Sequence, residues 1–188
     1  MPQQPHESVP LSEVLRSGLS NTAARSGPES GGDEHCGDFG IRILRDGTWL
    51  YHGSPITRKP LVRLFSSVLR RERDSYWLVT PVERGRIEVD DAPFTAVEMT
   101  IDGTGAAQRV TFRTNVDDTV TADDAHPLRV VLDHATGAPS PYIEVRHGLE
   151  ALIVRAVYYD LVERGETRVV DGEEIYGVWS AGTFFRLG

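Results

Sequence analysis

The sequence holds a single cysteine, Cys36, and no long apolar run. One thiol excludes a framework of intrachain disulfides, which small exported domains use to supplement their cores. No stretch approaches the roughly 18 consecutive apolar residues of a membrane-spanning helix, and no apolar segment follows Met1 as in an export signal. We therefore expect a cytoplasmic protein that makes no membrane contact.

Sequence motifs for nucleotide chemistry and for nucleophilic catalysis are also missing. Neither the G-x-G-x-x-G nor the G-x-x-x-x-G-K-[ST] phosphate-binding pattern occurs, and Lys59 is the only lysine. Ser54 lacks the G-x-S-x-G turn that exposes a hydrolase serine. His35 adjoins Cys36, but neighbouring side chains on an extended chain point apart. We expect no cofactor and no catalytic residue.

One loop imitates the start of a calcium-binding loop at Asn115, Asp117 and Thr119. Val120 stands where that loop needs glycine, and His126 stands where it needs a bidentate glutamate, so an EF-hand is excluded. A solvated acidic loop without metal is the expected structure. The alternative is a chelating group made by Asp123, Asp124 and His126.

What the sequence does contain is a basic segment within an acidic chain. Residues 41–73 carry 8 basic and 2 acidic side chains, although the whole chain has a formal net charge of -8. Residues 1–38 carry 2 basic and 6 acidic side chains, and residues 74–188 carry 10 basic and 20 acidic ones. A local positive excess attracts anionic partners, although pairing with acidic groups of the same protein is the common alternative.

Residues 1–37 are expected to form a flexible tail. There is no aromatic residue before Phe39, and proline, glycine and serine supply 15 of the first 38 positions. Such a segment buries too little apolar surface to offset its ordering entropy. The alternative for residues 10–19 is a short helix with one apolar face that docks on the protein or forms with a partner, because it is marginal alone.

The segment from Thr57 to Arg71 predicts an amphipathic helix with Pro60 in its first turn. Apolar side chains at helical spacing predict a core-facing stripe of Leu61, Leu64, Phe65, Val68 and Leu69. The cationic side chains of this segment are our candidate binding residues for an anionic partner: Arg58, Lys59, Arg63, Arg70 and Arg71. Alternatively, they pair within the protein or interact with the negative end of the helix dipole.

Around this helix the apolar pattern has the two-residue period of β-strands. Asp46-Gly47 predicts a tight hairpin turn. Further strands are expected over residues 76–80, 86–89, 94–101, 108–113, 128–133, 142–146, 149–154, 168–170 and 175–185, with a helical turn at 158–163. This order predicts an α+β fold of two small sheet-rich lobes with mainly antiparallel strands. Residues 38–93 would hold the one central amphipathic helix, and residues 94–188 would be mainly β.

Seven strings carry a resemblance to a known family: GTWLYHGSPI (47–56), LVRLFSSVLRRE (61–72), LVTPVE (78–83), VDDAPF (89–94), TFRTNVDD (111–118), LEALIVRAVYYDLVE (149–163) and GVWSAGTFF (177–185). In this order they resemble the motifs of the proteobacterial family of uncharacterised proteins known as domain of unknown function 1285. The resemblance covers about residues 36–188. It implies a small two-domain α+β architecture and a role in signalling, and it brings no established catalytic residue.

We therefore expect a non-catalytic binding or regulatory protein in bacterial signal transduction that recognises a protein or a small anionic ligand. The first alternative is an enzyme of unknown class with a site between the lobes. The second is nucleic-acid binding through the arginine-rich helix, which is disfavoured because the rest of the chain is acidic and would repel a phosphate backbone. The sequence does not determine the oligomeric state.

Overall fold

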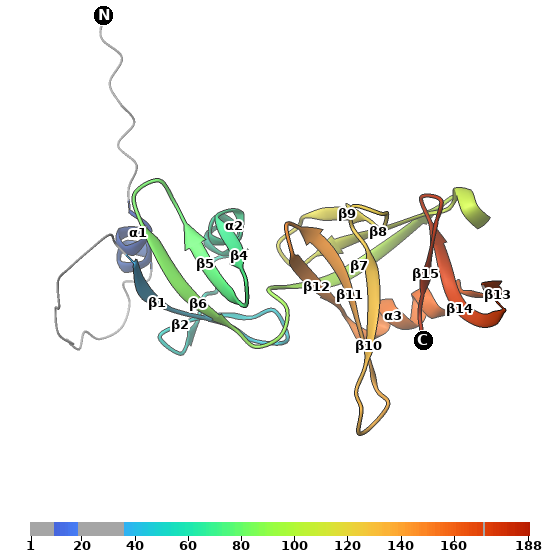
Figure 1. Cartoon of the computed structure of the whole chain (residues 1–188). Coiled ribbons are helices and arrows are strands. Elements are labelled where there is room, and N and C mark those ends of the chain that lie inside the picture. Colours follow the sequence, from blue (N-terminus) through green and yellow to red (C-terminus); the bar gives the residue numbers. More distant parts are fainter. Residues whose placement is uncertain (1–9, 19–35, 171) are drawn as a thin grey trace, which may run out of the picture. The chain divides into compact units, whose positions relative to one another are not determined.

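A computed structural model of the chain describes residues 10–18, 36–170 and 172–188 (Figure 1). By their contacts these residues form two compact units. One lies within Met1–Ile43 and Thr48–Glu88, and the other comprises Leu44–Gly47 and Val89–Gly188. Each unit contains a six-stranded sheet, and helices are few in the described part of the chain, which confirms the α+β class.

The sheet of the first unit has the order β3-β2-β1-β6-β5-β4. Its strands are β1 (Cys36–Ile43), β2 (Trp49–Tyr51), β3 (Ser54–Pro55), β4 (Leu69–Glu72), β5 (Ser75–Val79) and β6 (Arg84–Val89). The predicted turn between β1 and β2 is present, with Gly47 at φ +84° and its N–H bonded to the Leu44 carbonyl oxygen. Ile41 and Ile43 are buried on one face of this sheet.

The amphipathic helix α2 spans Lys59–Ser67 and is shorter than predicted. Val68 leaves the helical conformation, with φ -102° and ψ 4°, and its carbonyl oxygen accepts from the N–H of Val79. Leu69 then pairs with Leu78 in an antiparallel hairpin, where both side chains are fully buried. The prediction of a helix to Arg71 was therefore wrong, because strand pairing and burial outweigh the helical spacing of a short segment.

The core stripe of α2 was predicted correctly at Leu61 and Phe65, which are buried. Phe65 packs against Trp49 with the ring centroids 6.4 Å apart. Leu64 was predicted to be buried as well, but its side chain is 46% exposed. Because α2 is short, two side chains one turn apart suffice to contact the sheet, and Leu64 lies beside that contact.

Part of the expected flexible tail is instead a docked helix, α1 (Leu11–Gly18). Leu11 and Leu15 are buried, and Glu83 accepts hydrogen bonds from the Ser12 N–H at 2.7 Å and from the Ser12 hydroxyl at 3.0 Å. The carboxylate thus supplies an acceptor to the first turn of α1, which a helix this short lacks on its own. The flexible-tail prediction is wrong for residues 10–18, and positions 1–9 and 19–35 lie outside the described residues.

The main sheet of the second unit has the order β10-β11-β12-β7-β8-β9. Its strands are β7 (Phe94–Asp102), β8 (Arg109–Thr114), β9 (Thr119–Thr121), β10 (Leu128–Leu132), β11 (Pro139–Arg146) and β12 (Leu149–Ile153). β12 pairs with β7 in parallel, and the other neighbours are antiparallel. The strand β9 was not predicted, because its three residues lie within a polar loop.

Helix α3 (Arg155–Val162) follows β12 almost where the sequence predicts it and buries Val157, Tyr158 and Leu161. The strands β13 (Glu166–Val170), β14 (Glu173–Ser180) and β15 (Thr183–Arg186) complete a small third sheet. The single strand expected over 175–185 is a hairpin, whose turn places Ala181 and Gly182 at positive φ. No helix among the described residues is long and apolar enough to cross a membrane.

Candidate functional site

The second unit contains a notch where strand β11 continues beyond the end of its neighbour β12. The pairing of the two strands ends at Tyr142 and Leu152. Beyond that pair, Pro139 and Pro141 have no N–H to donate, so β12 cannot continue along β11. The N–H of Val154 bonds instead to the Ala96 carbonyl oxygen of β7, and the chain then turns into α3.

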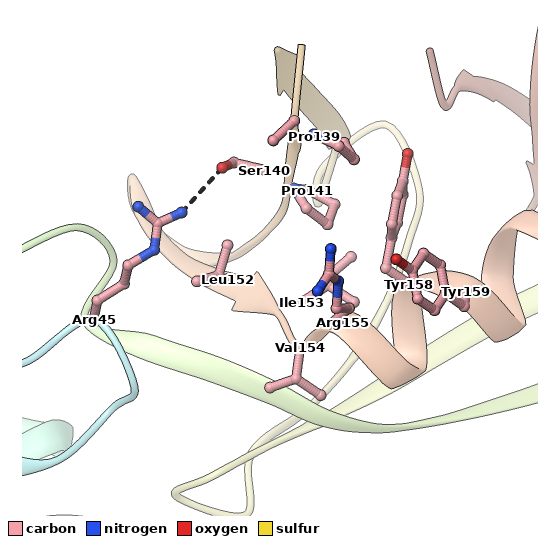
Figure 2. Close-up of a pocket in the computed structure, with 11 residues that line it drawn as sticks. Arg45, Pro139, Ser140, Pro141, Leu152, Ile153, Val154, Arg155, Tyr158 and Tyr159 are labelled. Carbon is pink, nitrogen blue, oxygen red and sulfur yellow. Dashed lines mark hydrogen bonds between the residues drawn. The ribbon is translucent and has the colours of Figure 1, made fainter. Parts of the chain in front are cut away.

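The notch has a volume of about 260 Å³. Figure 2 shows the side chains around it, which are mostly apolar or aromatic. They come from the turn between β1 and β2, the start of β11, the end of β12 and the first turns of α3. The lining residues are Arg45, Ala138, Pro139, Ser140, Pro141, Leu152, Ile153, Val154, Arg155, Tyr158 and Tyr159.

Arg45 is held in place on one side of the notch. Its Nη2 donates to the Ser140 hydroxyl at 3.0 Å, and its Nε lies 3.4 Å from Asp91 Oδ2 (Figure 2 draws the first contact). The turn that carries Arg45 is fixed by Asn115, whose Nδ2 donates to the Gly47 carbonyl oxygen at 3.2 Å. A Cβ on Gly47 would come within 2.6 Å of that amide nitrogen, so this turn also requires glycine for close approach.

A polar network on the sheet positions the partner of Arg45. The Tyr142 hydroxyl donates to Asp91 Oδ1 at 2.8 Å. Burial and the Asp91 carboxylate raise the pKa of Tyr142, so the phenol stays protonated as a donor. Arg129 lies over the Tyr142 ring at 4.5 Å and binds both carboxylate oxygens of Glu150, at 2.6 and 2.7 Å. These contacts hold Asp91, and through it Arg45, in a defined place.

Arg155 provides the second cation of the notch and is the first residue of α3. Its guanidinium lies 5.7 Å from the centroid of the Tyr159 ring, and it has no carboxylate partner among the residues that the structure describes. The first turn of α3 holds no acidic residue, and the side chain of Val154 gives it no cap. The positive end of the helix therefore adds to the charge of Arg155.

The side chains of the notch offer positive charge and hydrogen-bond donors to an anion. The polar groups of the notch lining are two guanidiniums, one serine hydroxyl and the hydroxyls of Tyr158 and Tyr159, of which that of Tyr158 donates to the Leu187 carbonyl oxygen at 2.6 Å. The lining contains no carboxylate, imidazole or thiol. Such groups are the usual general acids, bases and activated nucleophiles. The notch therefore combines fixed positive charge with apolar and aromatic side chains.

The five binding residues that the sequence predicts lie on different elements of the structure. Arg58 is the residue before α2, and Lys59 and Arg63 are exposed on that helix. Arg70 and Arg71 lie instead on strand β4, where consecutive side chains point to opposite faces of the sheet. The five side chains therefore do not form one stripe. Arg71 contacts the Tyr76 ring at 5.7 Å.

Arg70 belongs to an arginine face made of Arg70, Trp77, Arg84 and Arg86 on β4, β5 and β6. The strand register places Arg70, Trp77 and Arg86 in one row across the three strands. Arg84 lies 4.2 Å from the centroid of the Trp77 ring and 2.5 Å from a Glu72 carboxylate oxygen. Arg86 makes no side-chain hydrogen bond or ion pair with the described residues. Sequence reasoning missed Arg84 and Arg86, although the alternation in RGRIEV was a signal for them.

Two domain models of one protein family match this chain, and together they cover residues 31–187. Residues 31–92 match the N-terminal domain of unknown function DUF1285, and residues 93–187 match the C-terminal domain of that protein family. No curated protein matches the chain.

Two crystal structures are similar to this chain. One is a DUF1285 family protein from Silicibacter pomeroyi DSS-3, which is 46% identical, with a TM-score of 0.77 over 92% of this chain and 93% of that one. The other is a DUF1285 family protein from Shewanella baltica OS155, which is 27% identical, with a TM-score of 0.52 over 66% of this chain and 91% of that one. These similarities confirm the family resemblance of the sequence motifs.

Proposed function

We propose that this chain, which belongs to the DUF1285 family, is a non-catalytic binding protein that recognises a small anionic ligand in the notch of its second unit. The observation that carries the proposal is the pair of guanidiniums, Arg45 and Arg155, on an apolar cavity of about 260 Å³. That volume is just below the roughly 300–1,000 Å³ of clefts for drug-sized ligands, so the ligand is small.

The binding serves a regulatory role, in signal transduction in the bacterial cytoplasm. This part of the proposal is supported by the notch lining, which has no carboxylate, imidazole or thiol. The cytoplasmic location is supported by the single cysteine and by the absence of long apolar runs in the sequence.

A thermal-shift series tests the proposal. Small anions added as sodium salts, at constant ionic strength with chloride as the reference, should raise the melting temperature of the second unit by several degrees at saturation. A ligand at 100 times its Kd stabilises the native state by about 2.7 kcal/mol. Lys59→Gln, which removes a cation from the other unit, should leave the shift unchanged. Equal melting temperatures in every anion would contradict the proposal.

The arginine face supports a second candidate function, recognition of an acidic protein segment. Arg86 lies in a row with Arg70 and Trp77. The arginines can bind a carboxylate side chain of a partner, and the Trp77 ring can contact an apolar one. The exposed Lys59 and Arg63 on α2, and Arg58 just before it, extend the positive field of this unit.

The variant Arg70→Glu with Arg86→Glu tests this surface. Fluorescence anisotropy should show that a labelled peptide rich in glutamate and leucine binds the native chain, more weakly at high salt, and that the double reversal removes the binding. Far-UV circular dichroism should stay unchanged, because exposed charges contribute little to folding. Tighter binding of a single-stranded oligonucleotide than of the peptide would favour nucleic-acid binding and contradict this candidate.

A further inference from the structure

We infer that the ligand of the notch is a monocarboxylate with a compact apolar body, of the class of small aromatic acids. This inference rests on the proposed function. It specifies that the ligand has one negative charge, that this charge is a carboxylate, and that the rest of the ligand is compact and apolar.

The charge follows from the groups that line and adjoin the notch. Two guanidiniums line the notch, and only that of Arg45 lies beside a carboxylate, with its Nε 3.4 Å from Asp91 Oδ2. That oxygen accepts no hydrogen bond from the described residues, so the contact compensates the charge of Arg45 without a hydrogen bond, and a second Arg45 nitrogen, Nη2, donates to the Ser140 hydroxyl. Arg155 remains uncompensated in the part of the chain that the structure describes. One negative charge on the ligand balances the site, and a second would be desolvated without a partner.

The carboxylate form follows from the shape of the donors. A guanidinium presents a planar fork that matches the two oxygens of a carboxylate. The Ser140 hydroxyl, 3.0 Å from Arg45 Nη2, gives one more polar group on the same side. The uncapped first turn of α3 favours negative charge beside Arg155.

The apolar body follows from the remaining walls of the notch. They include Ile153, Val154, Pro139, Pro141 and the tyrosines of α3 (Figure 2). Each methylene group that a ligand buries on such walls strengthens binding by about fourfold. Proline and tyrosine rings also offer flat surfaces, against which an aromatic ring packs better than a branched chain.

Isothermal titration of the full chain with benzoate, acetate and phthalate at constant ionic strength and pH 7 tests the inference. Benzoate should bind at least about tenfold more tightly than acetate, because it adds a buried ring to the same carboxylate. Phthalate should bind no more tightly than benzoate, because its second carboxylate finds no partner.

Two variants separate the parts of the inference. Tyr159→Ala should reduce the advantage of benzoate over acetate, and the fold should persist because this side chain is 53% exposed.

Asp91→Asn keeps the acceptor for Tyr142 and removes one negative charge from beside the site. It should therefore strengthen phthalate binding relative to benzoate by about threefold.

The possible results are distinguishable. If none of the three anions binds, the proposed function itself is wrong. If acetate binds as tightly as benzoate, the notch still binds anions but the inference about the apolar body is overturned. If phthalate binds the native chain more tightly than benzoate, the inference about the single charge is overturned.

Discussion

Phe65→Ala should destabilise the first unit by about 3–5 kcal/mol, whereas Leu64→Ala should cost less than about 1 kcal/mol. Phe65 is fully buried and packs against Trp49, so its truncation leaves a cavity under α2. Leu64 is the neighbouring residue on the same helix, with a side chain that is 46% exposed. The pair is a matched test of which face of α2 is buried.

Urea unfolding followed by far-UV circular dichroism measures both free energies, with tryptophan fluorescence as a second probe. Trp49 and Trp77 report on the first unit and Trp179 on the second, so the variants should shift only the part of the transition that belongs to the first unit. A cost for Leu64→Ala equal to that of Phe65→Ala would mean that the orientation of α2 is wrong.

Arg155→Gln should weaken benzoate binding at least about tenfold, the largest effect expected from a single substitution in the notch. Its guanidinium has no carboxylate partner among the described residues, so its removal takes away the uncompensated charge that attracts the ligand. Arg45→Gln should have a smaller effect, because Asp91 already balances part of its charge. Titration calorimetry measures both dissociation constants.

The matched control is Arg164→Gln, which removes an exposed arginine two residues beyond the other end of α3. It lowers the net charge of the chain by the same amount without touching the notch lining. Equal losses of affinity in Arg155→Gln and Arg164→Gln would show that benzoate responds to the overall charge of the unit, and the assignment of Arg155 would fail.

Much of the fold could be predicted from local sequence patterns. The turn at Asp46-Gly47 has a strong local signal and is present. The stretch from Leu149 to Arg164 is ambiguous between strand and helix in the sequence, and the favoured order of a strand followed by a helical turn is present. The helix prediction failed at its C-terminal end, because Leu69 fits a helical spacing and a strand spacing equally well. Only its pairing with Leu78 of the next strand decides between the two.

The sequence left a docked helix at residues 10–19 open as an alternative, but the place where α1 docks could not be predicted. The segment is too short to be stable alone, and its acceptor, Glu83, lies 71 positions further along the chain. The composition of residues 10–18 predicts only whether this helix is stable in isolation. The contacts that stabilise α1 come from a strand turn that the sequence pattern does not connect to it.

The notch was missed because no local pattern brings its two arginines together. Arg45 lies in a hairpin turn and Arg155 begins a helix 110 positions later. Their proximity to one cavity depends on the register of β11 and β12 and on where that pairing ends. The Pro-Ser-Pro string at 139–141 was the one available signal, because alternating prolines mark a strand edge that cannot be paired.

The claim that the notch binds a small anion is tested most directly by crystals of the chain soaked with 4-bromobenzoate. The bromine gives an anomalous signal that locates the ligand without prior assumptions about the site. We predict one strong bromine peak in the notch, against the rings of Pro141 and Tyr158, with the carboxylate within hydrogen-bonding distance of Arg155 or Arg45. Bromine peaks confined to other surfaces, or none in crystals soaked to saturation, would contradict it.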